Sequence, residues 1–414
     1  MIKNFLVSVV LLFSVAVAAQ TGTSSIYSFY GIGDITFKGS LENRSMGGVS
    51  VFSDSIHINM QNPASYAGLK LTSFTLGATN SRTSFKTDEE TGKANRNSLD
   101  YLAFAVPISS KFGAGVTLMP YSSVGYNIMD PADNVSEGDR GYSGTGGLNK
   151  VSFNVGYKLT SKINIGVDLN YGFGEITTTE IIGQGIQYAT RERNVSNMSG
   201  LSATTGLMFQ SRLKNKMDVF ASLVYTPETT LKLGNTRTLA TIIPTDSGDI
   251  VQNEREIPVS NVDLKMPSKI AIGGGIGVVK KWLVGTEITF AQSNLANRFD
   301  DIKAATYQNS QKYSVGGYFI PNWNSFTSYF ERMVYRAGLR YEKTGLVING
   351  KSIEDKAVTF GFGLPLRGTF SNINFGAEFG RRGTRANNLV QENYSNFSIS
   401  LSLNDLWFEK RKYD

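Results

Sequence analysis

The sequence predicts an all-β protein, a transmembrane antiparallel β-barrel of about 14 strands. Apolar and polar residues alternate in many runs, and glycine (43) and aromatic residues (Phe 25, Tyr 19, Trp 3) are abundant while proline (10) is scarce. After the first twenty residues no stretch approaches the ~18 consecutive apolar residues of a membrane helix. Because only helices and closed barrels satisfy every backbone group in lipid, a membrane form of this chain must be a barrel.

The clearest alternation lies near the end of the chain, in residues 393–408. Serine occupies the even positions from 398 to 402, and the odd positions are apolar: Phe397, Ile399, Leu401 and Leu403. A soluble sheet with one wet face would alternate in the same way. Here, however, the stretch ends in Trp407 and Phe408, and aromatic residues at a strand end are typical of a bilayer interface. We therefore expect the closing strand of an outer-membrane barrel.

Residues 1–19 have the pattern of a secretory signal peptide. Lys3 precedes an apolar run from Phe5 to Val17, and small residues follow up to Ala19. Such a run is too short to span a bilayer, so we expect its removal near Gln20 and export of the mature chain. The predicted location is the cell outer membrane of a Gram-negative bacterium.

Composition excludes several classes of function. The formal net charge is +7, and because Lys3 contributes one of these charges the mature chain carries 7 − 1 = +6. The basic residues are dispersed, and an exported chain meets no nucleic acid, so none is expected as a partner. With no cysteine and one histidine, His57, the chain lacks the usual metal clusters and triads. The run Gly273–Gly277 lies in an alternating stretch with no helix after it, so it is interpreted as small residues that let side chains or a plug pack close rather than as a nucleotide loop. We expect no enzyme and no cofactor, and a hydrogen-bonded His57.

The mature chain divides into a compact N-terminal segment, residues 20–68, and a barrel, residues 69–414. The segment alternates poorly and is rich in Gly, Ser and Asn. The expected strands are 69–86, 96–108, 112–127, 147–160, 162–182, 198–213, 216–236, 253–279, 282–295, 307–320, 329–345, 354–367, 371–383 and 393–408. Short turns alternate with longer connections such as residues 128–146, 183–197 and 238–252, the pattern of an outer-membrane barrel.

Short motifs resemble one family of outer-membrane barrels. The N-terminal segment contains Arg44-Ser45-Met46-Gly47-Gly48 and then Asn62-Pro63-Ala64, and the chain closes with residues 404–412, Asn-Asp-Leu-Trp-Phe-Glu-Lys-Arg-Lys. These features resemble the FadL long-chain fatty acid transporter superfamily, which includes the OmpP1, TodX and PorV-like barrels. The resemblance implies a fourteen-stranded barrel whose N-terminal segment is a hatch, or plug.

Two prolines are candidate functional residues. Asn62-Pro63 favours a tight turn, and with Ala64 it is interpreted either as the gating part of the plug or as a surface turn. A plug is favoured because a wide barrel would otherwise be an open hole. Pro120 cannot donate a ladder hydrogen bond. It marks either the lateral-opening kink that the resemblance implies or a bulge at the rim.

Charged residues on the expected inward face form the third candidate site. By alternation Arg336 and Arg340 share one face, and Asp168, Glu287 and Glu378 take inward positions on other strands. An Arg or Lys facing lipid near the midplane would cost about 2–4 kcal/mol. Inward, the two arginines could hold a ligand carboxylate in the lumen, or instead pair with other lumen charges or hold the plug.

Two functions from different classes remain open. The leading hypothesis is a FadL-like channel that binds or passes small hydrophobic, fatty-acid-like molecules through a plugged barrel with lateral exit. The other is a non-transporting barrel subunit of an outer-membrane protein secretion or assembly complex, as in PorV-like members. The inward residues are largely Gly, Ser, Asn and charged, which counts against a roomy apolar lumen. Expected partners are outer-membrane lipid and lipopolysaccharide, a fatty-acid-like ligand, or the other proteins of such a complex.

Overall fold

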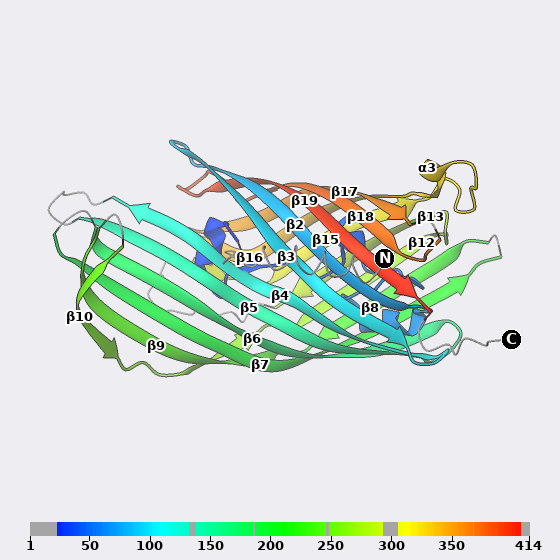
Figure 1. The fold of residues 1–414 in the computed structure, drawn as a ribbon, viewed down its shortest axis with the longest axis horizontal. Coiled ribbons are helices and arrows are strands. Elements are labelled where there is room, and N and C mark those ends of the chain that lie inside the picture. Colours follow the sequence, from blue (N-terminus) through cyan, green and yellow to red (C-terminus); the bar gives the residue numbers. More distant parts are fainter. Residues whose placement is uncertain are drawn as a thin grey trace.

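The computed structural model is an antiparallel barrel whose strands follow one another around the wall (Figure 1). It describes residues 23–131, 138–184, 187–214, 216–245, 248–292, 305–366 and 368–406. The wall closes where the last strand pairs with the first, from Asp405 opposite Thr72 to Gln391 opposite Lys86. The serine-rich stretch near the C-terminus is therefore the closing strand that its alternation predicts.

The strands of the wall have the following bounds: β2 Thr72–Lys86, β3 Thr91–Pro107, β4 Phe112–Asp130, β5 Asp139–Lys158, β6 Ile163–Gln184, β7 Ala189–Arg212, β8 Asp218–Thr226, β9 Thr229–Ile243, β10 Ile250–Ile257, β11 Val262–Met266, β12 Lys269–Val278, β13 Trp282–Ala291, β14 Ala305–Tyr307, β15 Ser310–Phe319, β16 Val334–Ile348, β17 Lys351–Pro365, β18 Asn372–Arg382 and β19 Gln391–Asp405. Some of these are pieces of one longer strand. β8 continues as β9, β10 and β11 as β12, and β14 as β15, because the pieces of each set pair with the same neighbours. In the described part of the chain the wall therefore has fourteen strands, which confirms the predicted antiparallel barrel of about 14 strands.

Exposure along the strands is the reverse of that in a soluble sheet. Phe153 and Leu169 are 57% and 58% exposed, whereas the polar Asn154 and Asn170, their neighbours in sequence, are each 2% exposed. Apolar residues thus face outward and polar residues inward, as a barrel in lipid requires. No helix in the described part of the chain is long and apolar enough to cross a membrane.

Several predicted strand ends are wrong. The expected connections 128–146, 183–197 and 238–252 are mostly strand, since β4, β5, β7, β9 and β10 extend into them. In such extensions the outward residues do not need to be apolar, so the alternation weakens while backbone pairing continues. The expected strand 329–345 instead begins with a short helix, α3 Tyr329–Arg332, and the strand runs on to Ile348.

The N-terminal segment, here residues 23–71, lies against the inward side of the wall (Figure 1). It contains η1 Ile26–Phe29, β1 Asp34–Ile35, α2 Leu41–Arg44 and η2 Pro63–Gly68. Its apolar side chains form clusters with inward residues of the strands, such as Phe52 with Phe220 of β8 and Leu283 of β13. The predicted signal peptide and the interface residues Trp407 and Phe408 lie outside the described residues.

Candidate functional site

Asn62 precedes η2, and Pro63 and Ala64 are its first two residues, where η2 contacts the inward face of the wall. Asn62 is the residue before the helix, and its side-chain oxygen accepts a hydrogen bond from the Ala64 amide at 3.0 Å. Its side-chain amide donates to the Leu207 carbonyl of β7 at 3.4 Å. Asn62 and Ala64 are both fully buried. The motif is thus a capped turn docked on the wall, not a turn exposed on the surface.

η2 packs against a row of four glycines on the inward face of the wall. Gly113, Gly156, Gly166 and Gly206 lie opposite one another on the adjacent strands β4, β5, β6 and β7. A Cβ on Gly166 would stand 2.5 Å from the Pro63 carbonyl oxygen, and one on Gly156 2.5 Å from the Ala67 nitrogen. Both distances are shorter than real Cβ contacts, so only glycine allows the helix backbone to come this close. We call these residues the first glycine row.

A second glycine row receives Met46, Gly47 and Phe52 on another part of the wall. It consists of Gly275, Gly285, Gly316 and Gly338, which pair across β12, β13, β15 and β16. A Cβ on Gly285 would stand 2.8 Å from Phe52 Cζ, and one on Gly338 2.8 Å from the Gly47 Cα. The two motifs of the N-terminal segment therefore dock on the wall through backbone contacts at two separate places.

Hydrogen bonds reinforce this docking. Ser50 donates from its amide and its hydroxyl to one carboxylate oxygen of Glu287, at 2.9 and 2.6 Å. The Gly47 amide donates to the Thr359 hydroxyl at 2.9 Å. Glu287, predicted to face inward, therefore holds the segment. Buried hydrogen bonds of this kind are costly to leave unmade, so the segment is held in one arrangement.

Arg336 and Arg340 both lie on the inward face of β16, but they have different partners. Arg340 donates from one nitrogen to Asp355 at 3.1 Å, to Glu378 at 2.8 Å and to the Tyr394 hydroxyl at 2.8 Å. These partners come from β17, β18 and β19, so the cluster ties four neighbouring strands together. The guanidinium is thus occupied by acids of the wall.

Arg336 connects the wall to the N-terminal segment. It donates to Asn374 of β18 at 3.1 Å, and Asn374 donates to Glu42 of the segment at 2.8 Å. Arg336 is 7% exposed and Asn374 1%. Asp168, the remaining inward acid, lies 3.9 Å from Lys150 of β5. Both arginines thus have protein partners in this structure. Arg340 pairs with acids of the wall, and Arg336 connects the wall to the N-terminal segment.

Pro120 lies where the wall opens between β3 and β4. The ladder between these strands runs from Pro107 opposite Gly113 only to Leu102 opposite Leu118, and their longer remainders diverge (Figure 1). The β4 register against β5 also shifts between Pro120 and Ser122, which marks a bulge. Past the bulge β4 pairs instead with β1 of the segment, Ile35 opposite Ser122.

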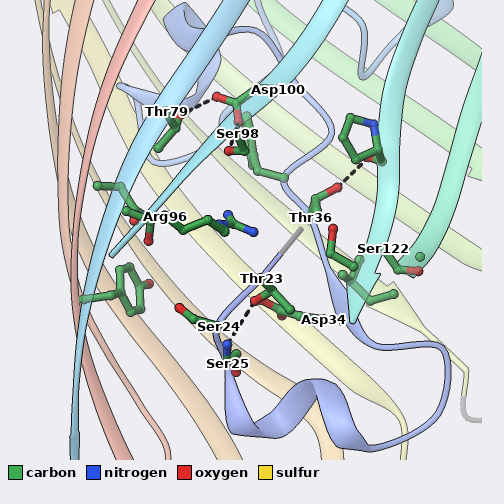
Figure 2. A pocket seen from close by; sticks show the side chains of 18 of the residues that line it. Thr23, Ser24, Ser25, Asp34, Thr36, Thr79, Arg96, Ser98, Asp100 and Ser122 are labelled. Atoms are coloured by element: carbon green, nitrogen blue, oxygen red, sulfur yellow. Dashed lines mark hydrogen bonds between the residues drawn. The ribbon is translucent and has the colours of Figure 1, made fainter. Parts of the chain in front are cut away.

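A cavity of about 470 Å³ lies at this opening (Figure 2). Its lining is mostly polar and includes the arginines Arg44, Arg96, Arg340 and Arg382 and the acids Asp34, Asp100, Glu175, Asp355, Glu378 and Glu392. Three of the arginines form ion pairs, Arg44 with Asp100, Arg382 with Asp34, and Arg340 as above. Arg96 extends from β3 into the cavity, and in the described part of the chain its guanidinium has no ion pair.

An apolar cavity of about 460 Å³ lies elsewhere, on the outer face of the barrel. Its lining residues on β5 to β8 include Tyr157, Val167 and Tyr225, which are among the exposed apolar side chains of the wall. The two cavities therefore differ in polarity and in location, which decide what kind of ligand each could hold. The cavity at the wall opening is polar and charged, and the apolar cavity faces outward.

His57 forms a charged pair within the segment. Its Nδ1 lies 2.7 Å from Asp54, and its Nε2 lies 4.0 Å from Glu42. Burial lowers the pKa of His57, but the Asp54 carboxylate and then Glu42 outweigh it, so the pKa is raised above the usual 6.5. The expectation of a hydrogen-bonded histidine is confirmed. Among the described residues, no group of three His, Asp or Glu side chains is arranged to hold a metal ion.

The glycine rows were predicted only in part: close packing was expected at the run Gly273–Gly277, and Gly275 belongs to the second row, where Phe52 packs on it. A signal for the other members also exists. In the run 165–173, for example, Gly166 takes an inward position between Ile165 and Val167. A glycine at an inward position leaves room for something to approach the wall. What the sequence does not provide is the register, which aligns glycines of four strands into one row.

Comparisons with known proteins give a family and a fold. A family model described as BamG matches residues 1–414. No curated protein sequence matches the chain. Among solved structures, the chain is similar to the toluene transporter TodX of Pseudomonas putida, with 17% identity, a TM-score of 0.60 and coverage of 90% of this chain and 98% of that one.

Two further structures are of the same kind. The toluene transporter TbuX of Ralstonia pickettii is 14% identical with a TM-score of 0.61, covering 89% of this chain and 99% of the other. A FadL homologue of Pseudomonas aeruginosa is 12% identical with a TM-score of 0.56, covering 91% and 99%. At these identities the likeness concerns the fold, which is that of FadL-type barrels, as the motifs predict.

Proposed function

This chain belongs to the BamG family, and from that premise we propose that it is a plugged, non-conducting barrel of the Gram-negative outer membrane that serves as a subunit of a protein secretion or assembly complex. The proposed mature form follows removal of residues 1–19. The outward apolar face and the polar inward face support the membrane location.

The observation that carries this proposal is the docking of the N-terminal segment by its backbone. Asn62-Pro63-Ala64 lies on the first glycine row and Met46-Gly47 on the second, so the segment is anchored at two separate places. A gate that opens for each substrate would have to break both contacts and the Ser50–Glu287 hydrogen bonds together. A fixed seal needs no such movement, and a barrel that conducts nothing presents its functional surface to other proteins.

The second candidate is the FadL-like channel, with Asn62, Pro63 and Ala64 as its gate and lateral exit at Pro120. Two observations favour it: the fold is that of TodX and TbuX, and the wall is unpaired beside Pro120. The charges lining the cavity at this opening weigh against it. An apolar molecule in this cavity would contact charged and polar side chains, and removing those groups from water costs free energy. Arg336 and Arg340 would also have to leave their partners to bind a carboxylate.

Purification from native outer membrane in mild detergent tests the two candidates on one sample. The subunit proposal expects a stable protein partner and no small hydrophobic ligand in near-stoichiometric amount, together with no pores when the protein is inserted in planar bilayers. A bound fatty-acid-like molecule without any protein partner would overturn it in favour of the channel.

A further inference from the structure

We propose that the free backbone edge of β3, residues Thr91–Tyr101, binds an extended segment of a partner polypeptide by strand addition. The proposal rests on the subunit role and names the surface that performs it. β3 pairs with β2 from Thr91 onward, but it pairs with β4 only from Leu102 to Pro107. One edge of β3 thus carries unpaired backbone groups along most of the strand. An open edge of this kind is a template for another strand.

The opposite side of the opening, on β4, is covered in part by the N-terminal segment. The segment strand β1 pairs with β4 at Ser122 and Ser123. Thr36, the residue after β1, continues this cover: its amide donates to the Tyr121 carbonyl at 3.1 Å and its hydroxyl to the Pro120 carbonyl. The protein therefore uses strand addition once itself, over two residues of β4, and among the described residues no strand pairs with the corresponding edge of β3 before Leu102.

The chemistry of the β3 edge fits a polypeptide better than a lipid. Alternate residues of an antiparallel strand direct both backbone groups to the same side, so about five N–H and five C=O groups face the opening. Only another backbone can pair with all of them. The neighbouring side chains Asn95, Arg96, Asn97 and Ser98 are polar, and the cavity behind them is polar as well.

Arg96 indicates one feature of the partner segment. Its side chain reaches into the cavity between β3 and the N-terminal segment (Figure 2). Of the four arginines lining the cavity, Arg44, Arg340 and Arg382 already have carboxylate partners. Arg96 is the one that has no carboxylate within ion-pair distance among the described residues, so we expect a strand on β3 to place an Asp or Glu opposite it.

A cross-linking experiment on the full-length protein in native outer membranes tests the proposal. A photoreactive benzoylphenylalanine replaces Asn95, Asn97 or Leu99 one at a time, and cross-linked peptides are mapped by mass spectrometry. The matched control is Thr190, which is exposed on β7 and paired on both sides, with Ile182 and Thr241. The expected result is one partner segment whose cross-linked position moves by two residues with each step along β3, and no adduct at Thr190.

Arg96→Glu tests the charge. It should lower the cross-linking yield about tenfold, and exchanging the opposing acid of the partner for Arg should restore it. Adducts to lipid alone, to a second copy of this chain, or to scattered positions would overturn strand addition. If a partner co-purifies but β3 gives no adduct, the subunit role stands and this proposal falls. If no partner co-purifies at all, the subunit role itself falls.

Discussion

Gly166 of β6 contacts the backbone of Pro63 so closely that a Cβ on Gly166 would stand 2.5 Å from the Pro63 carbonyl oxygen. The contact joins β6 to the start of η2. Direct contact between the two backbones therefore fixes the position of the N-terminal segment at this point. Flexible side chains can adjust to a poor fit, but two backbones cannot. The fit between the segment and the wall can therefore be tested with single methyl groups.

Gly166→Ala should loosen the segment. The added methyl collides with the backbone of Pro63 and Ala64, and overpacking of this kind costs about 1–3 kcal/mol. We expect faster proteolysis within residues 23–71 with the barrel still assembled. Gly172→Ala is the control on the same strand, because its Cβ would have ordinary contacts of 3.7 Å or more. Equal proteolysis of the two variants would contradict the proposed fit.

Asn62→Ala should weaken the same contact from the other side. It removes the cap of η2 and leaves the Leu207 carbonyl without its side-chain donor, a loss of about 1–2 kcal/mol. The measurement is the thermal midpoint at which residues 23–71 become protease-sensitive. Ser328→Ala is a matched control, since Ser328 precedes α3 without a side-chain capping bond. A midpoint unchanged in Asn62→Ala would show that the cap contributes nothing.

Arg340→Met should destabilise the wall itself. It removes the ion pair of the buried Glu378 and leaves Asp355 only Arg382 as a cationic partner, at 3.6 Å, and breaking a buried pair in this way costs about 3–5 kcal/mol. Arg385→Met is the control: Arg385 is paired with Asp88 at the surface, where a pair is worth about 0–1 kcal/mol. Unfolding in urea from detergent or lipid compares the two. Similar losses would mean that the Arg340 cluster is not a structural tie.

Much of the barrel could be predicted because a strand between lipid and lumen has a strict period. The serines 398–402 and the apolar residues between them identify β19, and residues 165–173 identify β6, without any knowledge of their neighbours. Where both faces of a strand are polar, as in β10 with Asn253 and Glu254, the period disappears and the predicted strand ends are wrong. In such a strand the backbone pairing continues, but the sequence shows no alternation of apolar and polar residues that would reveal it.

The site was predictable only as separate parts. The Asn62-Pro63 turn could be identified from its residue types, and the inward side of Arg340 from the alternation. The partners of Arg340 could not, because Asp355, Glu378 and Tyr394 come from three other strands and meet only through the register of the wall. For the same reason the β3 edge was missed: Pro120 indicates a kink or bulge in β4 but does not show which neighbouring strand loses its partner.

Raising the pH should loosen the segment near His57. Asp54 and Glu42 raise the pKa of His57 in spite of its burial and of the opposing charge of Arg336, so the folded state favours the charged imidazole. A raised pKa contributes stability that is fully present below the unfolded value, 6.5, and is lost as the pH rises through the folded value. Protease sensitivity of residues 23–71 should therefore increase above about pH 7. His57→Gln should abolish that dependence. Because the chain has one histidine, a single imidazole resonance reports its pKa, and a value at or below 6.5 would contradict the prediction.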